Sequence, residues 1–159
     1  MKVLAIDPGT SCGWAVGDAD TVVAAGTWNL AARPGDSPGV RYLKLRGNLE
    51  EVLRAYPGLG LVAYERGTPV SFQAARASYG YIAHIEAWCA ERGLEHTAVM
   101  PATLKKYATG KGNAKKDAMR EMGRRRWPLD GASDDEVDAR WILDWTISSL
   151  SIRSEGAAS

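Results

Sequence analysis

Residues 2–17, KVLAIDPGTSCGWAVG, decide how this chain folds. They contain two short apolar runs, KVLAID and SCGWAVG, which the turn-forming residues PGT separate. A third run, TVVAAGTWNL (21–30), follows a second turn, GDAD (17–20). Runs of this length between turn signals predict three strands that follow one another as a meander. The chain therefore opens with an antiparallel part of a sheet.

The rest of the chain alternates helical and extended patterns. GLVAYE (60–65) and EHTAVM (95–100) predict a fourth and a fifth strand between helices. We therefore expect an α/β protein in which a five-stranded mixed sheet, a three-strand meander followed by parallel strands, is flanked by helices. We expect five helices. The first has Ser37 as N-cap and Pro38 as first residue and ends before Tyr56, and the second begins near Ser71 and ends at Gly93. The other three run from Pro101 to Lys106, from Ala114 to Arg125 with an interruption at Gly123, and from Ser133 to Leu150.

Length and composition indicate one globular domain, which we place at residues 1–150. A chain of 159 residues can bury a substantial core without staples. The tail, SIRSEGAAS (151–159), is small and polar, and we expect it to fray or be disordered. No stretch approaches the roughly 20 apolar residues of a membrane span, and the opening residues lack a secretory signal. Cys12 and Cys89 provide neither a disulfide framework nor a CxxC pair, so we expect a cytoplasmic protein without membrane association.

Positive charge is concentrated in one segment, although the formal net charge is only +1. Residues 105–126 contain nine Lys and Arg against Asp117 and Glu121, and nine minus two leaves +7. Such a surplus attracts phosphates, whose counterions are released on binding; the alternative is a solvated helix face. Trp127 beside this segment could stack on a base, but packing is the favoured interpretation. The candidate DNA-binding residues in the segment are Lys105, Lys106, Lys111, Lys115 and Arg120.

Four carboxylates stand at the ends of predicted elements, where separate segments can meet. Asp7 closes the first strand and Glu65 the fourth, while Asp135 and Asp138 share one face at the start of the last helix. Mg²⁺ prefers carboxylate oxygens, and divalent ions held in this way, paired roughly 4 Å apart, hydrolyse phosphodiesters. The four acids therefore indicate a metal cluster with nuclease chemistry.

Each acid also has an ordinary structural explanation. Asp7 before Pro-Gly is typical of a turn, and acids in a first helical turn are favoured by the helix dipole. The dipole explanation suits Asp134 and Glu136 better than Asp138, which lies deeper in the helix. Glu65 is hardest to explain in this way, because a carboxylate at the end of the apolar run LVAYE is costly unless it is paired or bound to a metal. The presence of all four acids together favours a metal cluster over these separate structural explanations.

The order and spacing of five segments carry a resemblance to a known family. The segments are IDPGT (6–10), CGWAV (12–16), VAYE (62–65), PATLKKYATGKGNAKKDAM (101–119) and DEVDA (135–139). Together they resemble the RuvC family of Holliday junction resolvases, in the ribonuclease H-like superfamily, from Met1 to about Leu150. The most specific part is the pattern Gly-x-Gly-x-Ala-x-Lys at 110–116 with the later Asp-x-x-Asp-Ala.

The resemblance implies a ribonuclease H-like fold and a function. A member of this family is a Mg²⁺-dependent endodeoxyribonuclease that binds a four-way junction as a homodimer and nicks it symmetrically, in recombination or phage DNA processing. The helix after Ser71 is then the dimer element, and no nucleotide cofactor is expected.

The resemblance also assigns residues. It implies two Mg²⁺ ions per site, for which Mn²⁺ substitutes, and it selects Asp135 over Asp134. Lys116 is expected near the catalytic face, where it can stabilise charge in the transition state. The implied metal ligands are Asp7, Glu65, Asp135 and Asp138, and the implied catalytic residues are these four and Lys116.

The segment after Glu65 departs from the family's pattern. Residues 66–70, RGTPV, replace the aromatic residue that follows this glutamate in the family, and the chain up to Gly80 is a few residues shorter. Arg66 and Phe72 are the candidate DNA contacts here. Because this loop touches the junction centre in the family, relaxed specificity for three-way junctions, flaps or structured RNA is the alternative function. Phage-encoded relatives show similar loops, which would place the protein in a host cytoplasm.

Two other classes of protein fit less well. Kinases and ATPases of the actin-like fold can also begin with IDxGT, but they need a second phosphate-binding half, for which 159 residues leave no room. A nuclease-like module that binds without cutting is disfavoured because all four acids are present.

Overall fold

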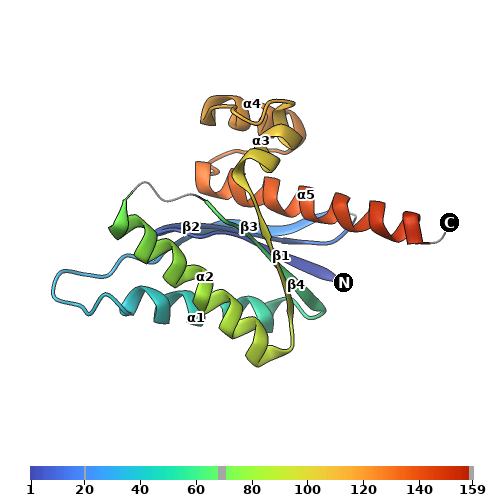
Figure 1. The fold of residues 1–159 in the computed structure, drawn as a ribbon. Coiled ribbons are helices and arrows are strands. Elements are labelled where there is room, and N and C mark those ends of the chain that lie inside the picture. The colour runs from blue at the N-terminus through green and yellow to red at the C-terminus, as the bar shows by residue number, and fades with distance from the viewer. Residues whose placement is uncertain (20, 68–70, 158–159) are drawn as a thin grey trace.

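A five-stranded sheet forms the centre of the structure, a computed structural model that describes residues 1–19, 21–67 and 71–157 (Figure 1). The strand order is β3-β2-β1-β4-β5. The first three strands pair antiparallel, and β4 is parallel to both β1 and β5. The predicted mixed sheet with an N-terminal meander is confirmed. The strands are β1 (Lys2–Asp7), β2 (Ser11–Gly17), β3 (Val22–Asn29), β4 (Leu59–Glu65) and β5 (Glu95–Val99).

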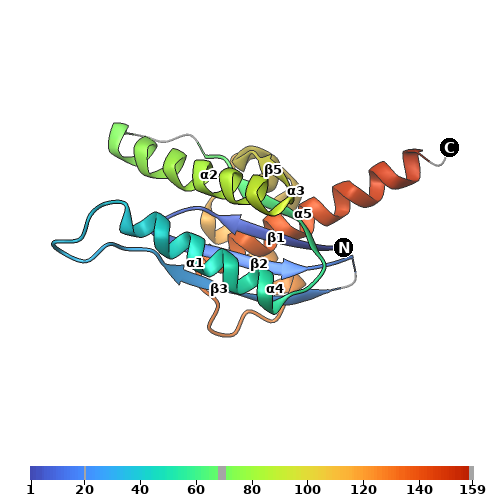
Figure 2. The same cartoon turned by 90° about the horizontal axis from the view of Figure 1, so that it is seen from below.

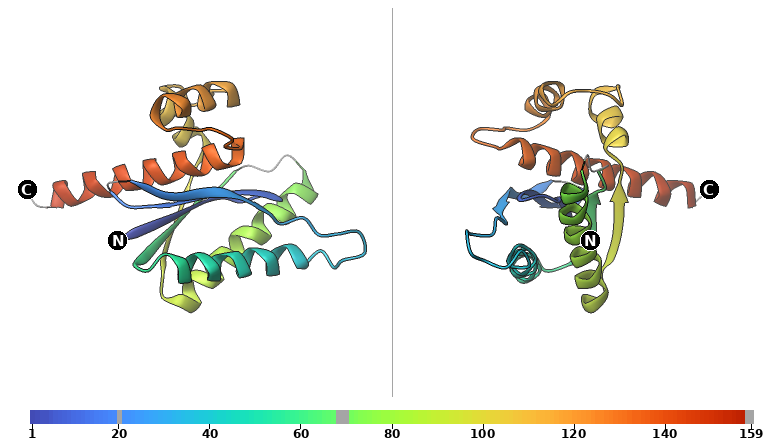
Figure 3. Two further views of the ribbon diagram at one scale, coloured as in Figure 1. Left: turned by 180° about the vertical axis from the view of Figure 1, so that it is seen from behind. Right: turned by 60° about the vertical axis from the view of Figure 1, so that its left-hand side comes forward.

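Helices cover both faces of the sheet, and two more form an outer layer. α1 (Val40–Ala55) and α2 (Phe72–Arg92) lie on one face (Figure 2). α5 (Asp134–Ala157) crosses the other face. α3 (Pro101–Thr109) and α4 (Lys116–Arg126) pack on the side of α5 that faces away from the sheet (Figure 3). The helix α5 is thus packed between the sheet and an outer layer.

Residue size differs between the two faces of the sheet. Alternation along β1 sends Leu4 and Ile6 toward α1 and α2, and Val3 and Ala5 toward α5. On the α5 side, one cross-strand row consists only of alanines, because Ala5 pairs with both Ala63 and Ala15, and Ala15 pairs with Ala25. Four small side chains in a row let α5 approach the backbone of the sheet closely.

The next cross-strand row toward the carboxyl end of β1 contains a candidate site residue, Asp7, beside a glycine. Asp7 pairs with Gly13, and Gly13 pairs with Thr27. A Cβ atom added to Gly13 would lie 1.8 Å from the backbone oxygen of Asp135. The first turn of α5 therefore rests directly on the backbone of β2, which only a glycine permits.

Several helix ends follow the predicted capping, and others do not. Ser71 caps α2 by accepting a hydrogen bond from Ala74 N at 3.1 Å, and Gly93 ends it in the left-handed conformation. The prediction for α1 was wrong: the helix begins at Val40, because Ser37 forms a turn in which its backbone oxygen accepts from Val40 N.

Two further predictions about helices were wrong. α4 runs through Gly123 without interruption, and this buried glycine lets the helix pack closely on Val137. The last helix does not end at Leu150 but continues to Ala157, so most of the segment predicted to fray is helical.

Other predictions about individual side chains are confirmed. Cys12 and Cys89 are free and buried, and Trp127 packs edge-on against Trp141 with ring centres 4.7 Å apart. Within the described residues, none of the helices combines the length and the apolar character that crossing a bilayer requires.

Candidate active site

Four carboxylates from three elements gather at one end of the sheet. Asp7 and Glu65 end β1 and β4, two parallel neighbours whose carboxyl ends share an edge. Asp135 and Asp138 belong to the first turns of α5, and Gly13 on β2 lets this end of the helix lie close to the same edge. Segments separated by most of the chain thus lie at the same end of the sheet, and the metal-binding role of these four acids stays a prediction.

The charge of each acid affects its neighbours, and Asp7 shows this most clearly. Burial raises the pKa of Asp7 well above its ordinary value, and the charges of Glu65, Asp138 and Asp135 raise it further. Lys116 acts in the opposite direction. The other three acids therefore all lie close enough to Asp7 to affect its pKa.

Glu65 and Asp138 are perturbed in the same direction. Burial, with a contribution from the charge of Asp138, raises the pKa of Glu65 from 4.5 to about 7. Burial also raises the pKa of Asp138 from 3.8 to about 6, and Lys116 opposes this shift. Lys105 lowers the pKa of both acids. Two lysines therefore compensate only part of the negative charge.

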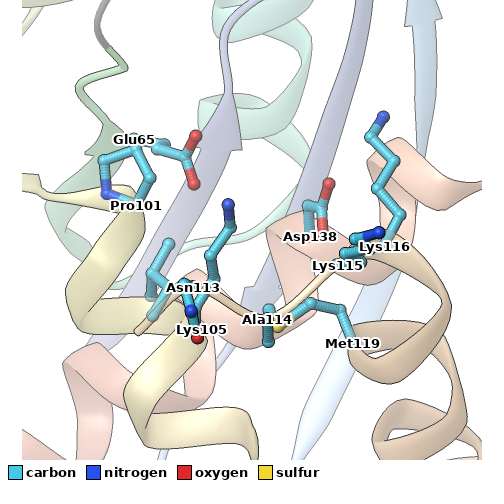
Figure 4. Close-up of a pocket in the computed structure, with 10 residues that line it drawn as sticks. Glu65, Pro101, Lys105, Asn113, Ala114, Lys115, Lys116, Met119 and Asp138 are labelled. Carbon is cyan, nitrogen blue, oxygen red and sulfur yellow. The ribbon is translucent and has the colours of Figure 1, made fainter. Parts of the chain in front are cut away.

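A cavity of about 480 Å³ opens beside these acids (Figure 4). Glu65 and Asp138 line one part of it, and the loop before α4 and the start of α4 line another. Carboxylates and lysine side chains thus line the same cavity, which has groups suited to a metal ion and to a phosphate. Its basic and amide side chains are Lys105, Asn113, Lys115 and Lys116.

Hydrogen bonds distinguish the two neighbouring acids at the start of α5. Asp135 Oδ2 accepts a hydrogen bond of 2.5 Å from Ser11 Oγ on β2. Asp134 instead pairs with Arg120, whose guanidinium also donates to Ala132 O at 2.9 Å. The two neighbouring acids thus have different partners, and the selection of Asp135 over Asp134 as a site residue stays a prediction. Arg120 is committed to the start of α5, and its predicted contact with DNA stays a prediction.

The remaining candidate contacts are exposed and are not among the residues that line the cavity. Lys106 lies on α3, and Lys111 lies in the loop that leads to α4. Arg66 follows β4, where its backbone N donates to Val99 O at 2.9 Å. Phe72 begins α2 with 84% of its surface exposed. Thr68, Pro69 and Val70, the centre of the altered loop, lie outside the described residues.

The donor set fits a hard divalent cation, although the side chains do not yet converge. Within the described residues, no three His, Cys, Asp or Glu side chains stand close enough together to hold a metal ion. Asp7, Glu65 and Asp138 nevertheless make no hydrogen bond or ion pair with another described side chain, and their pKa values are raised. Carboxylates that repel one another without protein partners are the ligands that Mg²⁺ favours.

Three site residues were missed by the sequence analysis. Ser11 and Gly13 contact Asp135, and Asn113 lines the cavity. Asn113 lies within the recognised segment 101–119 and could have been found there. Ser11 and Gly13 become significant only when the register of β2 against α5 is known.

The strand order and the helices on both faces define the ribonuclease H-like class of fold. No protein-family model and no curated protein matches this sequence. Solved structures do match it in three dimensions, and two of these are structures of Thermus thermophilus RuvC. The Thermus thermophilus RuvC structure in complex with a Holliday junction substrate has a TM-score of 0.75 and 21% identity over 90% of each chain. Another Thermus thermophilus RuvC structure has a TM-score of 0.71 and 22% identity over 90% of this chain and 91% of the other. The chain therefore has a RuvC-like fold.

Neutralising Glu65 should stabilise the metal-free protein at pH 8 but not at pH 4. Because the pKa of Glu65 is raised from 4.5 to about 7 on folding, the stability present at low pH is lost as the pH rises through this interval. Glu65→Gln lacks this charge, so its free energy of unfolding should exceed that of the wild type by about 1–3 kcal/mol at pH 8. Urea unfolding with EDTA at both pH values measures the difference.

The matched control is Glu51→Gln, which changes an exposed glutamate on α1. It should alter unfolding by less than about 0.5 kcal/mol at either pH. If Glu65→Gln were no more stable than the wild type at pH 8, the carboxylate at position 65 would not be under electrostatic strain.

Proposed function

We propose that this protein is a metal-dependent endonuclease that nicks four-way DNA junctions symmetrically. The observation that carries this proposal is that Glu65 and Asp138 line a cavity together with three lysines, while Asp7 lies close enough to these acids and to Asp135 to be affected by their charges. The RuvC-like fold supports it, because one of the matching structures is a RuvC in complex with a Holliday junction substrate. Acids that hold cations and lysines that hold phosphates are the two components that phosphodiester hydrolysis requires.

Asp7, Glu65, Asp135 and Asp138 would hold the metal, two Mg²⁺ ions per site with Mn²⁺ as a substitute. When bound, divalent ions activate water and neutralise the leaving oxygen. Asp7 is one of these ligands in this proposal, and the charges of the other three acids act on it. Binding of cations would also offset the repulsion that adds to the effect of burial on the pKa values of Asp7, Glu65 and Asp138.

The lysines and the start of α4 would hold the scissile phosphate. Lys116 is the first residue of α4 and acts electrostatically on Asp7, Glu65 and Asp138, so its ammonium group can offset negative charge that develops during cleavage. Lys115 makes no side-chain hydrogen bond that caps this helix. The first N–H groups of α4 therefore remain available to an anion.

DNA further from the cut would lie on the exposed basic residues around the cavity. Lys106 on α3, Lys111 in the loop before α4 and Arg66 after β4 are all exposed, so DNA could reach their side chains. These residues contact phosphates in our proposal, so they contribute affinity without sequence preference.

Two subunits would act together on one junction. Symmetric nicking requires two copies of the site, and we place the dimer contact on α2. The exposed aromatic side chains of Phe72 and Tyr79 on this helix support that placement, because exposed apolar surface marks contact regions. Phe72 would contact either the partner or the centre of the junction.

A nuclease of relaxed specificity is the second candidate. Arg66 and Phe72 flank the altered loop that follows Glu65, so selection of the junction shape would depend on a segment that departs from the family's pattern. Three-way junctions, flaps and structured RNA are the competing substrates.

Asp7→Asn should remove cleavage and leave junction binding nearly intact. The substitution removes a metal ligand but none of the lysines that hold phosphates. With Mg²⁺ and matched labelled substrates, the wild type should make paired symmetric nicks in a four-way junction, and Asp7→Asn should be at least about 100-fold slower. A gel-shift titration in Ca²⁺ or EDTA should give similar dissociation constants for both.

The control is Asp130→Asn, an exposed acid in the turn before α5, which should cut like the wild type. Undiminished nicking by Asp7→Asn would contradict the metal site. Cleavage confined to flaps or RNA would favour the second candidate.

Replacing Lys111 and Lys115 together by Gln should weaken junction binding and flatten its salt dependence. Each phosphate contact that is lost reduces the slope of log K against log salt by about 0.9. The double variant should therefore lose a slope of about 1–2. Fluorescence anisotropy with a labelled junction from about 50 to 200 mM salt measures this.

Arg41→Gln with Arg54→Gln is the matched double control, since both arginines lie on α1 across the sheet from the cavity. An unchanged slope in the lysine variant would mean that this surface is only solvated.

A further inference from the structure

The first turn of α5 is attached to the rim of the sheet by two hydroxyl contacts. Ser11 Oγ on β2 donates to Asp135 Oδ2 at 2.5 Å. Thr27 Oγ1 on β3 lies 2.6 Å from Ser133 Oγ, and Ser133 Oγ in turn accepts from Glu136 N at 3.0 Å. One contact therefore holds a carboxylate, whereas the other holds only the residue that caps the helix.

The strand register explains why these contacts fall where they do. Ser11 and Gly13 are two residues apart on β2, so they face the same side of the sheet, the side on which α5 lies. Gly13 has no side chain, and this lets the backbone of Asp135 rest on it. Once Asp135 is this close to β2, its side chain can reach Ser11.

We propose that Ser11 is a positioning residue for metal binding, which orients the carboxylate of Asp135 by fixing one of its two oxygens. The inference rests on the proposed metal role of Asp135. The other oxygen, Oδ1, makes no hydrogen bond with the described residues, so it remains available as a ligand. Hydrogen bonds to ligating carboxylates keep them in a productive orientation, and their loss typically weakens metal binding 10-fold to 100-fold.

Among the described residues, Ser11 is the one side chain that donates a hydrogen bond to any of the four acids. Asp7, Glu65 and Asp138 make no hydrogen bond with a described side chain, so they can move toward a cation without breaking one. Within the described residues, Asp135 is the single acid of the four whose carboxylate accepts a hydrogen bond from a side chain. Ser11 would therefore hold the carboxylate of Asp135 in place while the other three carboxylates move toward the cation.

The test compares Mn²⁺ binding by four full-length proteins: wild type, Ser11→Ala, Ser11→Thr and Thr27→Val. Electron paramagnetic resonance of free Mn²⁺ gives the dissociation constant without any cleavage. Ser11→Ala should bind Mn²⁺ about tenfold more weakly, and Ser11→Thr, which keeps the hydroxyl, should restore most of the affinity. Thr27→Val removes the hydroxyl contact that involves no carboxylate, so it should leave Mn²⁺ affinity unchanged even if it lowers the melting temperature.

A kinetic measurement separates positioning from a purely structural effect. Junction nicking by Ser11→Ala should recover to near the wild-type rate as Mg²⁺ is raised, because excess metal compensates for weaker binding. Wild-type Mn²⁺ affinity in Ser11→Ala, or an equal loss in Thr27→Val, would overturn the role of Ser11 and leave the proposed function standing. Absence of Mn²⁺ binding by the wild type would overturn both.

Discussion

The close approach of α5 to the sheet is the constraint on which the site depends. A row of alanines across β4, β1, β2 and β3 leaves room for the helix, and Gly13 in the next row lets the backbone of Asp135 rest on β2. A larger side chain at Gly13 would push the first turn of α5 away from Asp7. Small residues on one face of the sheet thus bring acids from opposite ends of the chain together.

This arrangement has an electrostatic consequence. Asp7, Glu65 and Asp138 are buried near one another, and their raised pKa values reflect first the cost of burying a carboxylate and then the repulsion between neighbouring acids. Lys116 and Lys105 offset part of the repulsion from the outer layer of helices. Divalent cations would offset the rest, so metal binding and stability are coupled in our account. In our account, these acids therefore lower the stability of the metal-free protein.

The sequence predicted the strands, because apolar runs between turns are local signals. It also singled out four acids at the ends of predicted elements, whose role as metal ligands stays a prediction. It failed where the outcome depends on contacts between distant segments. The pairing of Asp134 with Arg120 and the bond between Ser11 and Asp135 both require the register of α5 against its neighbours. The start of α1 was misplaced because Ser37 has the residue type of a cap but forms a turn.

The central claim is that the packing of α5 on the sheet assembles one cation site around Asp7. Anomalous diffraction from crystals grown with Mn²⁺ tests it most directly, because the scattering locates the ion independently of activity. The account predicts a strong anomalous peak among Asp7, Glu65 and the two acids of α5, and loss of that peak in Asp7→Asn. A protein that nicks junctions while its crystals show Mn²⁺ only elsewhere would contradict it.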